Sequence, residues 1–424
     1  MRSLVVTLFL IQSFSGQLGY GQTVKDVRAA AKQGSAGIPD LTRYFSGGSL
    51  EVRVEIVRQL INIGGKDSIG PLIQATRDND AEVQIRSTDG LVNFYLPGYV
   101  KTGLGSSLRR VGSSIKGRFV DNNDQVIDAF VVVRPDVISA VGSLARSGAN
   151  MDSRANAARA VGVLRGKAAL PDLVYALKSK DNDVMYESLL AIQKIRDPEA
   201  GPKVVYLLRD LDDRVQSAAL ETVGLLRTKD ALPALRAIVN APRNAKSERA
   251  ALASIAYMPD DSDRSLLTRY LVNKDEKLRA QAAEGLGRVA NKADEPALEK
   301  LWQEEGKMPP RLASAFALVM EGRLSISESS PLQYLVNTLN SAAYKNVAEA
   351  YLEEAARVPE VRTSLYGPLG QGTRDEKMQL AKVFAASGDA ESVAQLDRLS
   401  RDNDKDVATE GLRALRSLKS RLGM

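Results

Sequence analysis

The sequence of 424 residues contains no histidine and no cysteine. Without these side chains the chain has no ligands for zinc, haem or iron–sulfur sites, no Ser-His-Asp or Cys-His nucleophile, and no disulfide. Catalysis would then depend on Asp, Glu, Lys, Arg or Tyr, or on calcium or magnesium held by oxygen ligands. We therefore expect a protein that is not an enzyme and that holds no cofactor and no metal.

Aromatic residues are also scarce, at 5% of the chain, whereas apolar residues make up 44% and charged residues 26%. The sequence is dominated by Ala, Leu, Arg, Glu and Asp, a composition that favours helices over sheets. The sequence therefore predicts an all-α fold with a large buried core.

Long apolar runs are missing as well. Residues 1–21 combine a basic start at Arg2, a short apolar run and small residues at Gly19 and Gly21, which is typical of a secretory signal peptide. The run is shorter than the ~20 apolar residues that cross a bilayer. We expect an exported chain, periplasmic or extracellular after cleavage, with no transmembrane span; a buried first helix is the alternative.

A ten-residue pattern recurs along the chain about every 31 residues. Its clearest copies start 31, 31 and 63 residues apart, at 153–162, 184–193, 215–224 and 278–287. Further copies occupy 52–61, 83–92, 247–256 and 407–416. Apolar or small residues fill its first, fifth, sixth, eighth and ninth positions, which form one face of a helix. Self-similarity at this period predicts a solenoid.

A proline follows many of these copies. Pro171, Pro202, Pro233 and Pro296 each come ten residues after the apolar ninth position. Proline is tolerated in the first turn of a helix, where its missing N–H has no partner anyway. Each period is therefore predicted to be a helix, a short turn and a second helix that begins at the proline.

The pattern V-R-x-x-A-A-x-A-L-G, followed by A-L-P-x-L, resembles the short bacterial HEAT repeats, also called phycobilisome-lyase-like HEAT repeats. The resemblance covers residues 38–420. It implies a right-handed α-solenoid of about 10–11 HEAT-like repeats, whose second helices line a concave surface that binds another protein. The predicted organisation is N-terminal repeats at 22–92, an insertion at 93–133, clean repeats at 134–302, and degenerate repeats with a C-terminal capping helix at 303–424.

Two enzyme families resemble this architecture. Deoxyhypusine hydroxylase holds iron with His-Glu motifs, which a chain without histidine lacks. Phycocyanobilin lyases act on a cysteine of a client protein inside photosynthetic cells, which does not suit an exported chain. The resemblance therefore favours a scaffold, and an enzyme or lyase-like protein is the weaker alternative.

The tetrapeptide RDND stands at 77–80 and again at 401–404, with KDND at 180–183 and LDDR at 211–214. All four fall before a predicted first helix, where Asp or Asn can accept the unpaired backbone N–H groups. A calcium loop is the competing interpretation, but after 402 its sixth place is Val407 in place of glycine, and its twelfth is Arg413 in place of glutamate. We predict helix caps.

The insertion at 93–133 carries much of the formal charge of +6. No acidic residue lies between Asp89 and Asp121. Five cations do, which makes this stretch a candidate contact site for an acidic protein or an anionic envelope surface: Lys101, Arg109, Arg110, Lys116 and Arg118. The alternative is an enlarged loop that covers the end of a repeat. Its conformation stays open between an amphipathic helix over 104–119 and a hairpin that leads into a strand at 130–133.

A second candidate site lies on the predicted second helices. Tyr175 and Tyr206 stand four residues after their prolines, and Lys178 and Arg209 stand seven after them. On a concave face, this ladder of tyrosines and cations would suit a peptide or polysaccharide; tyrosines packed between helices are the alternative. The pI near 9.2 would also permit nucleic acid, but export argues against it. The sequence thus predicts a non-catalytic, exported scaffold for a protein partner of unknown identity, with an envelope polysaccharide as the second choice.

Overall fold

The chain is a two-layered array of helices in a computed structural model that describes residues 22–100 and 125–424. The first layer consists of these helices: α1 Val24–Ala31, α3 Leu50–Ile63, α5 Ala81–Tyr95, α7 Met151–Val163, α9 Asn182–Ile195, α11 Asp213–Leu225, α13 Ala245–Tyr257, α15 Glu276–Val289, α17 Met308–Met320, α19 Lys345–Ala355, α22 Arg374–Ser387 and α24 Lys405–Leu422. The second layer consists of these: α2 Ile38–Phe45, α4 Ile69–Ala75, α6 Pro135–Ser147, α8 Leu170–Ala176, α10 Gly201–Val204, α12 Leu232–Asn240, α14 Arg264–Tyr270, α16 Glu295–Glu304, α18 Pro331–Thr338, α20 Pro359–Ser364, α21 Tyr366–Gln371 and α23 Ala390–Leu399.

Successive helices of the first layer pack side by side, and most second-layer helices pack chiefly against the first-layer helix that follows them, as α12 does on α13 and α16 on α17. Within the described ranges this gives eleven repeats, closed by α24. The prediction of an all-α solenoid with about ten to eleven repeats is confirmed. In the part of the chain that the structure describes, none of the helices has the length and apolar character needed to cross a membrane.

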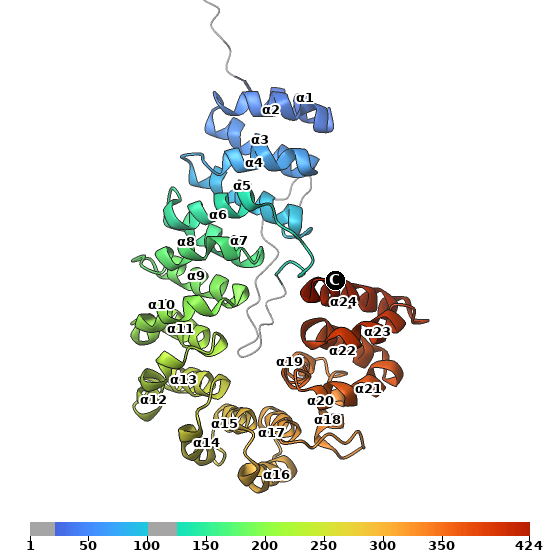
Figure 1. Cartoon of the computed structure of the whole chain (residues 1–424). Helices are drawn as coiled ribbons and strands as arrows, with labels where there is room; N and C mark the ends of the chain where they lie inside the picture. Colours follow the sequence, from blue (N-terminus) through green and yellow to red (C-terminus); the bar gives the residue numbers. More distant parts are fainter. Residues whose placement is uncertain (1–21, 101–124) are drawn as a thin grey trace, which may run out of the picture.

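The array bends into a hook whose C-terminal arm returns toward the middle of the N-terminal arm (Figure 1). The first-layer helices, such as α7, α13 and α22, lie on the inside of this curve, and the second-layer helices, such as α8, α12 and α23, lie on the outside. The expectation that the second helices line the concave surface is therefore wrong. We call the first layer the inner layer and the second layer the outer layer.

The outer helices begin where the prolines predict. Pro171, Pro202, Pro233 and Pro296 occupy the first turns of α8, α10, α12 and α16. The fixed φ of proline suits this position, and no hydrogen bond is lost there. The alternation of a long inner helix and a proline-started outer helix is confirmed for these four repeats, whereas α14 and α23 begin without a proline.

Small residues let neighbouring inner helices approach closely. The alanines at the fifth place of the pattern, such as Ala157 and Ala219, are fully buried. The glycine at the tenth place matters as much, because a Cβ on Gly162 would lie 2.7 Å from the Cα of Ala191. The equivalent Gly287 would meet its neighbouring helix at 2.6 Å. Real Cβ atoms do not approach that closely, so these helices pack at a distance that only glycine permits.

The RDND-type segments are helix caps. Asp80 accepts hydrogen bonds from the backbone N–H groups of residues 82 and 83 at the start of α5, at 2.9 and 3.3 Å. Asp181, Asp212 and Asp404 cap α9, α11 and α24 in the same way. Backbone hydrogen bonds to its carboxylate lower the pKa of Asp212, as expected for an anion at a helix N-terminus. The capping prediction is confirmed.

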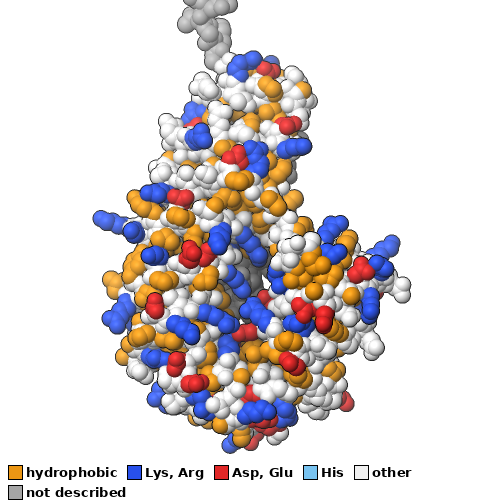
Figure 2. All heavy atoms as spheres, viewed as in Figure 1, with side chains coloured by type: hydrophobic (Ala, Val, Ile, Leu, Met, Phe, Trp, Pro, Cys, Tyr) orange, Lys and Arg blue, Asp and Glu red, His pale blue; other side chains and the backbone are white. Residues whose placement is uncertain are grey.

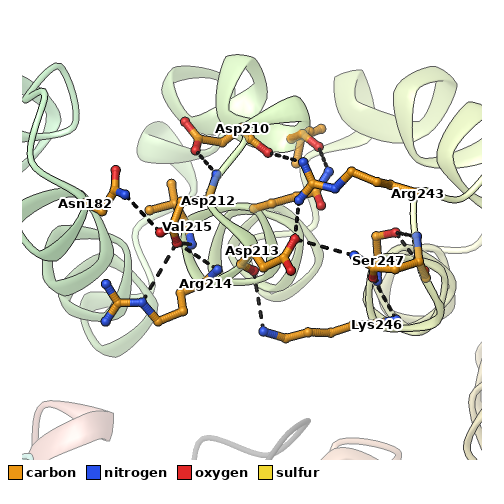
Figure 3. A network of polar contacts seen from close by, with 12 residues as sticks. Asn182, Asp210, Asp212, Asp213, Arg214, Val215, Arg243, Lys246 and Ser247 are labelled. Atoms are coloured by element: carbon orange, nitrogen blue, oxygen red, sulfur yellow. Dashed lines mark hydrogen bonds and ion pairs between the residues drawn. The ribbon is translucent and has the colours of Figure 1, made fainter.

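The same turns also join one repeat to the next (Figure 3). Besides capping α11, Asp212 accepts a hydrogen bond of 2.9 Å from the side chain of Asn182 in the preceding repeat. Asp213 is paired with Arg243 of the following repeat, whose Nη1 also donates to the carbonyl oxygen of Asp210 at 3.0 Å. The cap residues therefore align three successive inner helices as well as starting them.

The insertion separates the two helices of one repeat, α5 and α6. Residues 125–134 follow an irregular path, with a turn closed by a 3.0 Å bond from the N–H of Val131 to the carbonyl of Asp128. A strand at 130–133, one of the two conformations that the sequence left open, is therefore absent, and these residues form a turn and irregular backbone. The candidate helix over 104–119 falls outside the described residues, as does the predicted signal peptide at 1–21.

Candidate functional site

The concave inside of the curve is the candidate binding surface. It is built from the inner layer, and Figure 2 shows Lys and Arg side chains gathered around the hollow in the middle of the molecule. Three groups of described residues shape this surface: a segment that connects the two arms, ion pairs that cross between repeats, and a polar cluster at the base of the insertion.

The connecting segment is residues 125–134, which we call the strap. Its first part is held to the N-terminal arm, because the N–H of Ile127 donates to the carbonyl oxygen of Val163 at 3.1 Å. The next residue, Asp128, forms an ion pair of 2.5 Å with Arg413 on α24. Asp128 and Arg413 are 285 positions apart in the sequence. The strap thus ties the third and fourth repeats to the C-terminal helix (Figure 1).

Further ion pairs link inner helices that are not neighbours in the array. Two nitrogens of Arg288 on α15 donate hydrogen bonds to Glu354 on α19, with Nε at 2.9 Å from Oε1 and 3.1 Å from Oε2, and Nη2 at 2.7 Å from Oε2. The same carboxylate lies 3.1 Å from the guanidinium of Arg227, just after α11. These contacts skip one or more repeats, which is possible because the inner layer is on the concave side.

Arg288 is the centre of a buried polar network. Its side chain is 7% exposed, and its guanidinium lies over the rings of Tyr257 and Phe316, at 4.8 and 5.4 Å from their centroids. Glu284 lies beside it at 3.2 Å and accepts a hydrogen bond of 2.6 Å from Tyr351. Cationic and aromatic groups in such contact attract each other when they are desolvated.

The pKa values in this network follow from burial and pairing. Burial disfavours the charge of Arg288, but the adjacent Glu354 and Glu284 outweigh it and raise its pKa above the ordinary value. Burial by itself would raise the pKa of Glu354, yet Arg288 outweighs that effect and lowers it. For Glu284 burial prevails, and its pKa is raised in spite of Arg288. One buried cation therefore balances two buried carboxyl groups.

A second buried acid lies at the base of the insertion. Asp89 on α5 is 6% exposed and accepts a hydrogen bond of 3.1 Å from the side chain of Asn156 on α7. Burial raises the pKa of Asp89 to about 7. The first residues of the insertion pack over this place, with Tyr99 and Val100 buried and the Val100 N–H bound to the side chain of Asn93 at 3.0 Å. These contacts fix the start of the insertion on the inner layer.

The sequence-predicted site residues divide into two groups. The five cations of the insertion lie outside the described residues, so their role as a contact site stays a prediction: Lys101, Arg109, Arg110, Lys116 and Arg118. The two ends of the insertion, residues 96–100 and the strap, are bound to the inner layer, as the contacts of Val100 and Ile127 show.

The second group, the ladder of tyrosines and cations, lies in the outer layer. Tyr175 is in α8, and Tyr206 is in the 3₁₀ turn that follows α10. The ring of Tyr175 stacks on Arg146 at 4.4 Å, and the hydroxyl of Tyr206 donates to the carbonyl oxygen of Leu177 at 2.8 Å. Lys178 and Arg209 are exposed beside them. These residues are not on the concave face, and the tyrosines contact the neighbouring repeat.

Sequence reasoning missed a different set of arginines. Arg165, Arg196 and Arg227 follow α7, α9 and α11 at intervals of 31 residues, and all three are exposed. A signal was available, because the segments LRGK at 164–167, IRDP at 195–198 and LRTK at 226–229 place an arginine at the same point of each period.

The charged side chains of this surface are largely engaged with one another and with the backbone. Its carboxylates are mostly paired with arginines or bound to backbone N–H groups, as Glu354 and Asp212 are. Among residues 22–100 and 125–424, no group of three or more acidic side chains is placed to hold a metal ion. The arrangement offers exposed cations on a curved surface, which suits an acidic ligand.

Comparison with known protein families agrees with the helix pairs. A family model described as HEAT repeats matches residues 138–222, which extend from α6 to α11. The resemblance to HEAT repeats is thereby confirmed for that segment. No curated protein compared with the chain matches its sequence.

Several solved structures are similar to the chain at low identity and with low TM-scores. The complex of CpcE and CpcF of phycocyanin lyase from Nostoc sp. PCC7120 is 18% identical, with 62% of this chain and 90% of that chain covered and a TM-score of 0.37. Escherichia coli YibA is 15% identical, with coverages of 70% and 95% and a TM-score of 0.41. Human deoxyhypusine hydroxylase is 15% identical, with coverages of 67% and 96% and a TM-score of 0.28. At these values the likenesses carry no information on function.

Proposed function

We propose that this chain, whose residues 138–222 are HEAT repeats, is an exported scaffold that binds a protein partner on the inside of its curve and through its basic insertion. The scaffold acts by shape and charge and has no catalytic chemistry of its own. The absence of histidine and cysteine supports that last part, and a stoichiometric bound metal in the purified protein would contradict it.

One observation carries the proposal. Both ends of the insertion are bound to the inner layer, and the strap continues to α24, so the most basic stretch of the sequence begins and ends on the concave side. Loops held on rigid scaffolds commonly carry binding. An acidic protein surface is the partner that this charge fits best.

Neutralising the insertion is expected to weaken capture of the partner without affecting the fold. The variant replaces four cations by serine: Arg109, Arg110, Lys116 and Arg118. Helical circular dichroism and the melting temperature should stay within the error of the wild type, because all four lie in the sequence between α5 and α6, outside the helices that the structure describes. Partner recovery from an envelope extract should fall several-fold, as measured by quantitative mass spectrometry of affinity-purified protein.

The matched control removes the same charge from the outer layer, at these exposed cations: Lys203, Lys229, Arg269 and Lys300. Its partner recovery should equal that of the wild type. Equal recovery by both variants would remove the insertion from the site. An equal loss in both would show that only the net charge matters.

Export is tested by the mass of the mature chain. We expect the protein recovered from the periplasm or the medium to lack about the first 21 residues, because they have the features of a signal peptide. Intact-mass spectrometry of each cell fraction would measure this. A full-length chain confined to the cytosol would refute export and would favour nucleic acid as the ligand.

A further inference from the structure

Three arginines occupy one structural position in three successive repeats. Arg165, Arg196 and Arg227 have φ of 47°, 56° and 51°, in the left-handed region of the backbone. All three are exposed. We call them the arginine ladder. Together with Ala290 after α15, they are the four non-glycine residues of the described ranges that have a positive φ.

The turn itself does not call for arginine. A left-handed residue at the end of a helix is usually glycine or asparagine, and other residues adopt this conformation at a cost of roughly 1 kcal/mol. Ala290 shows that the same turn forms in this chain without a cation. Three arginines in a row, each in a conformation that disfavours it, therefore indicate that the guanidinium groups are needed.

The ladder faces the inside of the curve. At one end, Arg165 lies two residues after Val163, whose carbonyl oxygen binds the strap. At the other end, Arg227 reaches the carboxylate of Glu354 on the opposite arm at 3.1 Å. The rungs thus follow the ends of three inner helices between the strap and the C-terminal arm.

Glu354 shows which ligand the ladder takes. Its carboxylate is held chiefly by the hydrogen bonds from Nε and Nη2 of Arg288, and Arg227 adds one contact from the side. A carboxylate of this chain therefore already occupies the third rung. Carboxylates are the natural partners of guanidinium groups, because the planar donors match the two oxygens.

The spacing of the rungs defines the ligand further. Neighbouring packed helices lie about 8–10 Å apart, so we take a similar distance between successive rungs. A polyproline II segment rises about 3.1 Å per residue with three residues per turn, so every third side chain points the same way, about 9 Å from the last. An extended acidic segment with a carboxylate at every third residue would match the ladder.

We propose that the arginine ladder binds an extended, acidic segment of a partner protein, with Asp or Glu at every third position. This inference rests on the proposed function and specifies the chemistry of the partner. It assigns to Arg165 and Arg196 the role of contacting the ligand, while Arg227 completes the register beside Glu354.

The test uses the full mature chain and a labelled peptide of four Glu-Pro-Pro units. Fluorescence anisotropy at low salt would compare it with a peptide of the same composition whose four glutamates are consecutive. We expect the spaced peptide to bind more tightly, and its affinity to fall as salt is raised, since exposed charges are screened. An oligonucleotide and a sulfated polysaccharide serve as competing polyanions.

The variant Arg165→Asn/Arg196→Asn removes two charges and keeps residues that tolerate the left-handed turn. We expect the spaced peptide to bind about tenfold more weakly to it, which corresponds to the loss of two exposed ion pairs. The control Lys178→Asn/Arg209→Asn removes the same charge from the outer layer and should bind the peptide like the wild type. Equal melting temperatures of all three proteins would show that folding is preserved.

Two results would overturn the inference directly: equal affinity of the ladder variant and the wild type for the spaced peptide, or equal affinity of the wild type for the two peptides. It would also be overturned if the labelled peptide were displaced only by the oligonucleotide or the sulfated polysaccharide. The proposed function fails by a different result. If the wild type and the ladder variant capture the same envelope partner equally, the scaffold function stands and the ladder does not. If the wild type captures no partner, the scaffold function fails whatever the peptide does.

Discussion

The variant Arg288→Leu is expected to lose about 3–5 kcal/mol of its free energy of unfolding, the range for removing one partner of a buried ion pair. Glu354 and Glu284 would then be buried without the cation that balances them. The guanidinium contacts with Tyr257 and Phe316 would also be lost. Urea unfolding followed by circular dichroism at 222 nm would measure the change in the free energy of unfolding. The loss should be greater at pH 8 than at pH 5, because protonation relieves a stranded carboxylate.

The double variant Arg288→Leu/Glu354→Leu is the informative companion. Replacing both members of a buried pair by apolar residues costs much less than replacing one, so it should recover part of the lost stability. Arg227→Leu is the matched control on the same carboxylate. Its side chain is 56% exposed, so we expect less than about 1 kcal/mol. A loss for Arg288→Leu as small as that for Arg227→Leu would contradict the central role of Arg288.

A second large effect concerns pH. Asp89 has a pKa of about 7 in the folded chain because it is buried, against 3.8 as its ordinary value. The unfolded chain therefore releases this proton at a lower pH than the folded chain does. Stability from this group is full below about pH 4 and falls until the folded pKa is passed. Between pH 5.5 and pH 8 it should decline by about 2 kcal/mol.

The variant Asp89→Asn tests this assignment. Asparagine keeps an oxygen to accept the hydrogen bond from Asn156 but carries no charge, so the decline between pH 5.5 and pH 8 should be about 2 kcal/mol smaller. The chain has no histidine, the side chain that usually titrates in this range. Burial also raises the pKa of Glu321 and Glu349 to about 7, and they account for the decline that remains.

Denaturant unfolding at pH 5.5 and pH 8 would give the decline in the free energy of unfolding for the wild type and for Asp89→Asn. Asp152→Asn, at an exposed carboxylate of α7, is the control and should show the slope of the wild type. If the wild type were equally stable at pH 5.5 and pH 8, the burial of Asp89 would have no cost, and the assignment would be wrong.

The features that the sequence predicted correctly are local ones. Asp80 and Asp212 cap helices because a side chain reaches only two or three residues along the chain, and Pro171 starts a helix for an equally local reason. The inner helices were predictable because the apolar positions of one face recur at helical spacing. Their close packing could have been inferred from Gly162 and its equivalents, which stand at the tenth place of the pattern.

The features that were missed depend on the direction of curvature. The positions of Tyr175 and Tyr206 in the helical pattern do not predict whether the first or the second helices of the repeats line the concave side. The direction of curvature follows from small rotations summed over many repeats. The pairing of Arg288 with Glu354 spans 66 positions and skips a repeat, so the period does not predict it. A strand at 130–133, one of the two conformations that the sequence left open, was suggested by β-branched and aromatic residues, but the structure has a turn and irregular backbone there.

The bond between Asp128 and Arg413 changes how this array should come apart. In a tandem array whose units touch only adjacent units, unravelling can begin at either end and proceed one unit at a time. Here the terminal helix α24 is fastened to a segment near the opposite arm, and Glu354 joins units that are not adjacent. Detaching α24 therefore requires breaking a long-range tie first, which favours concerted melting of the C-terminal arm over gradual fraying.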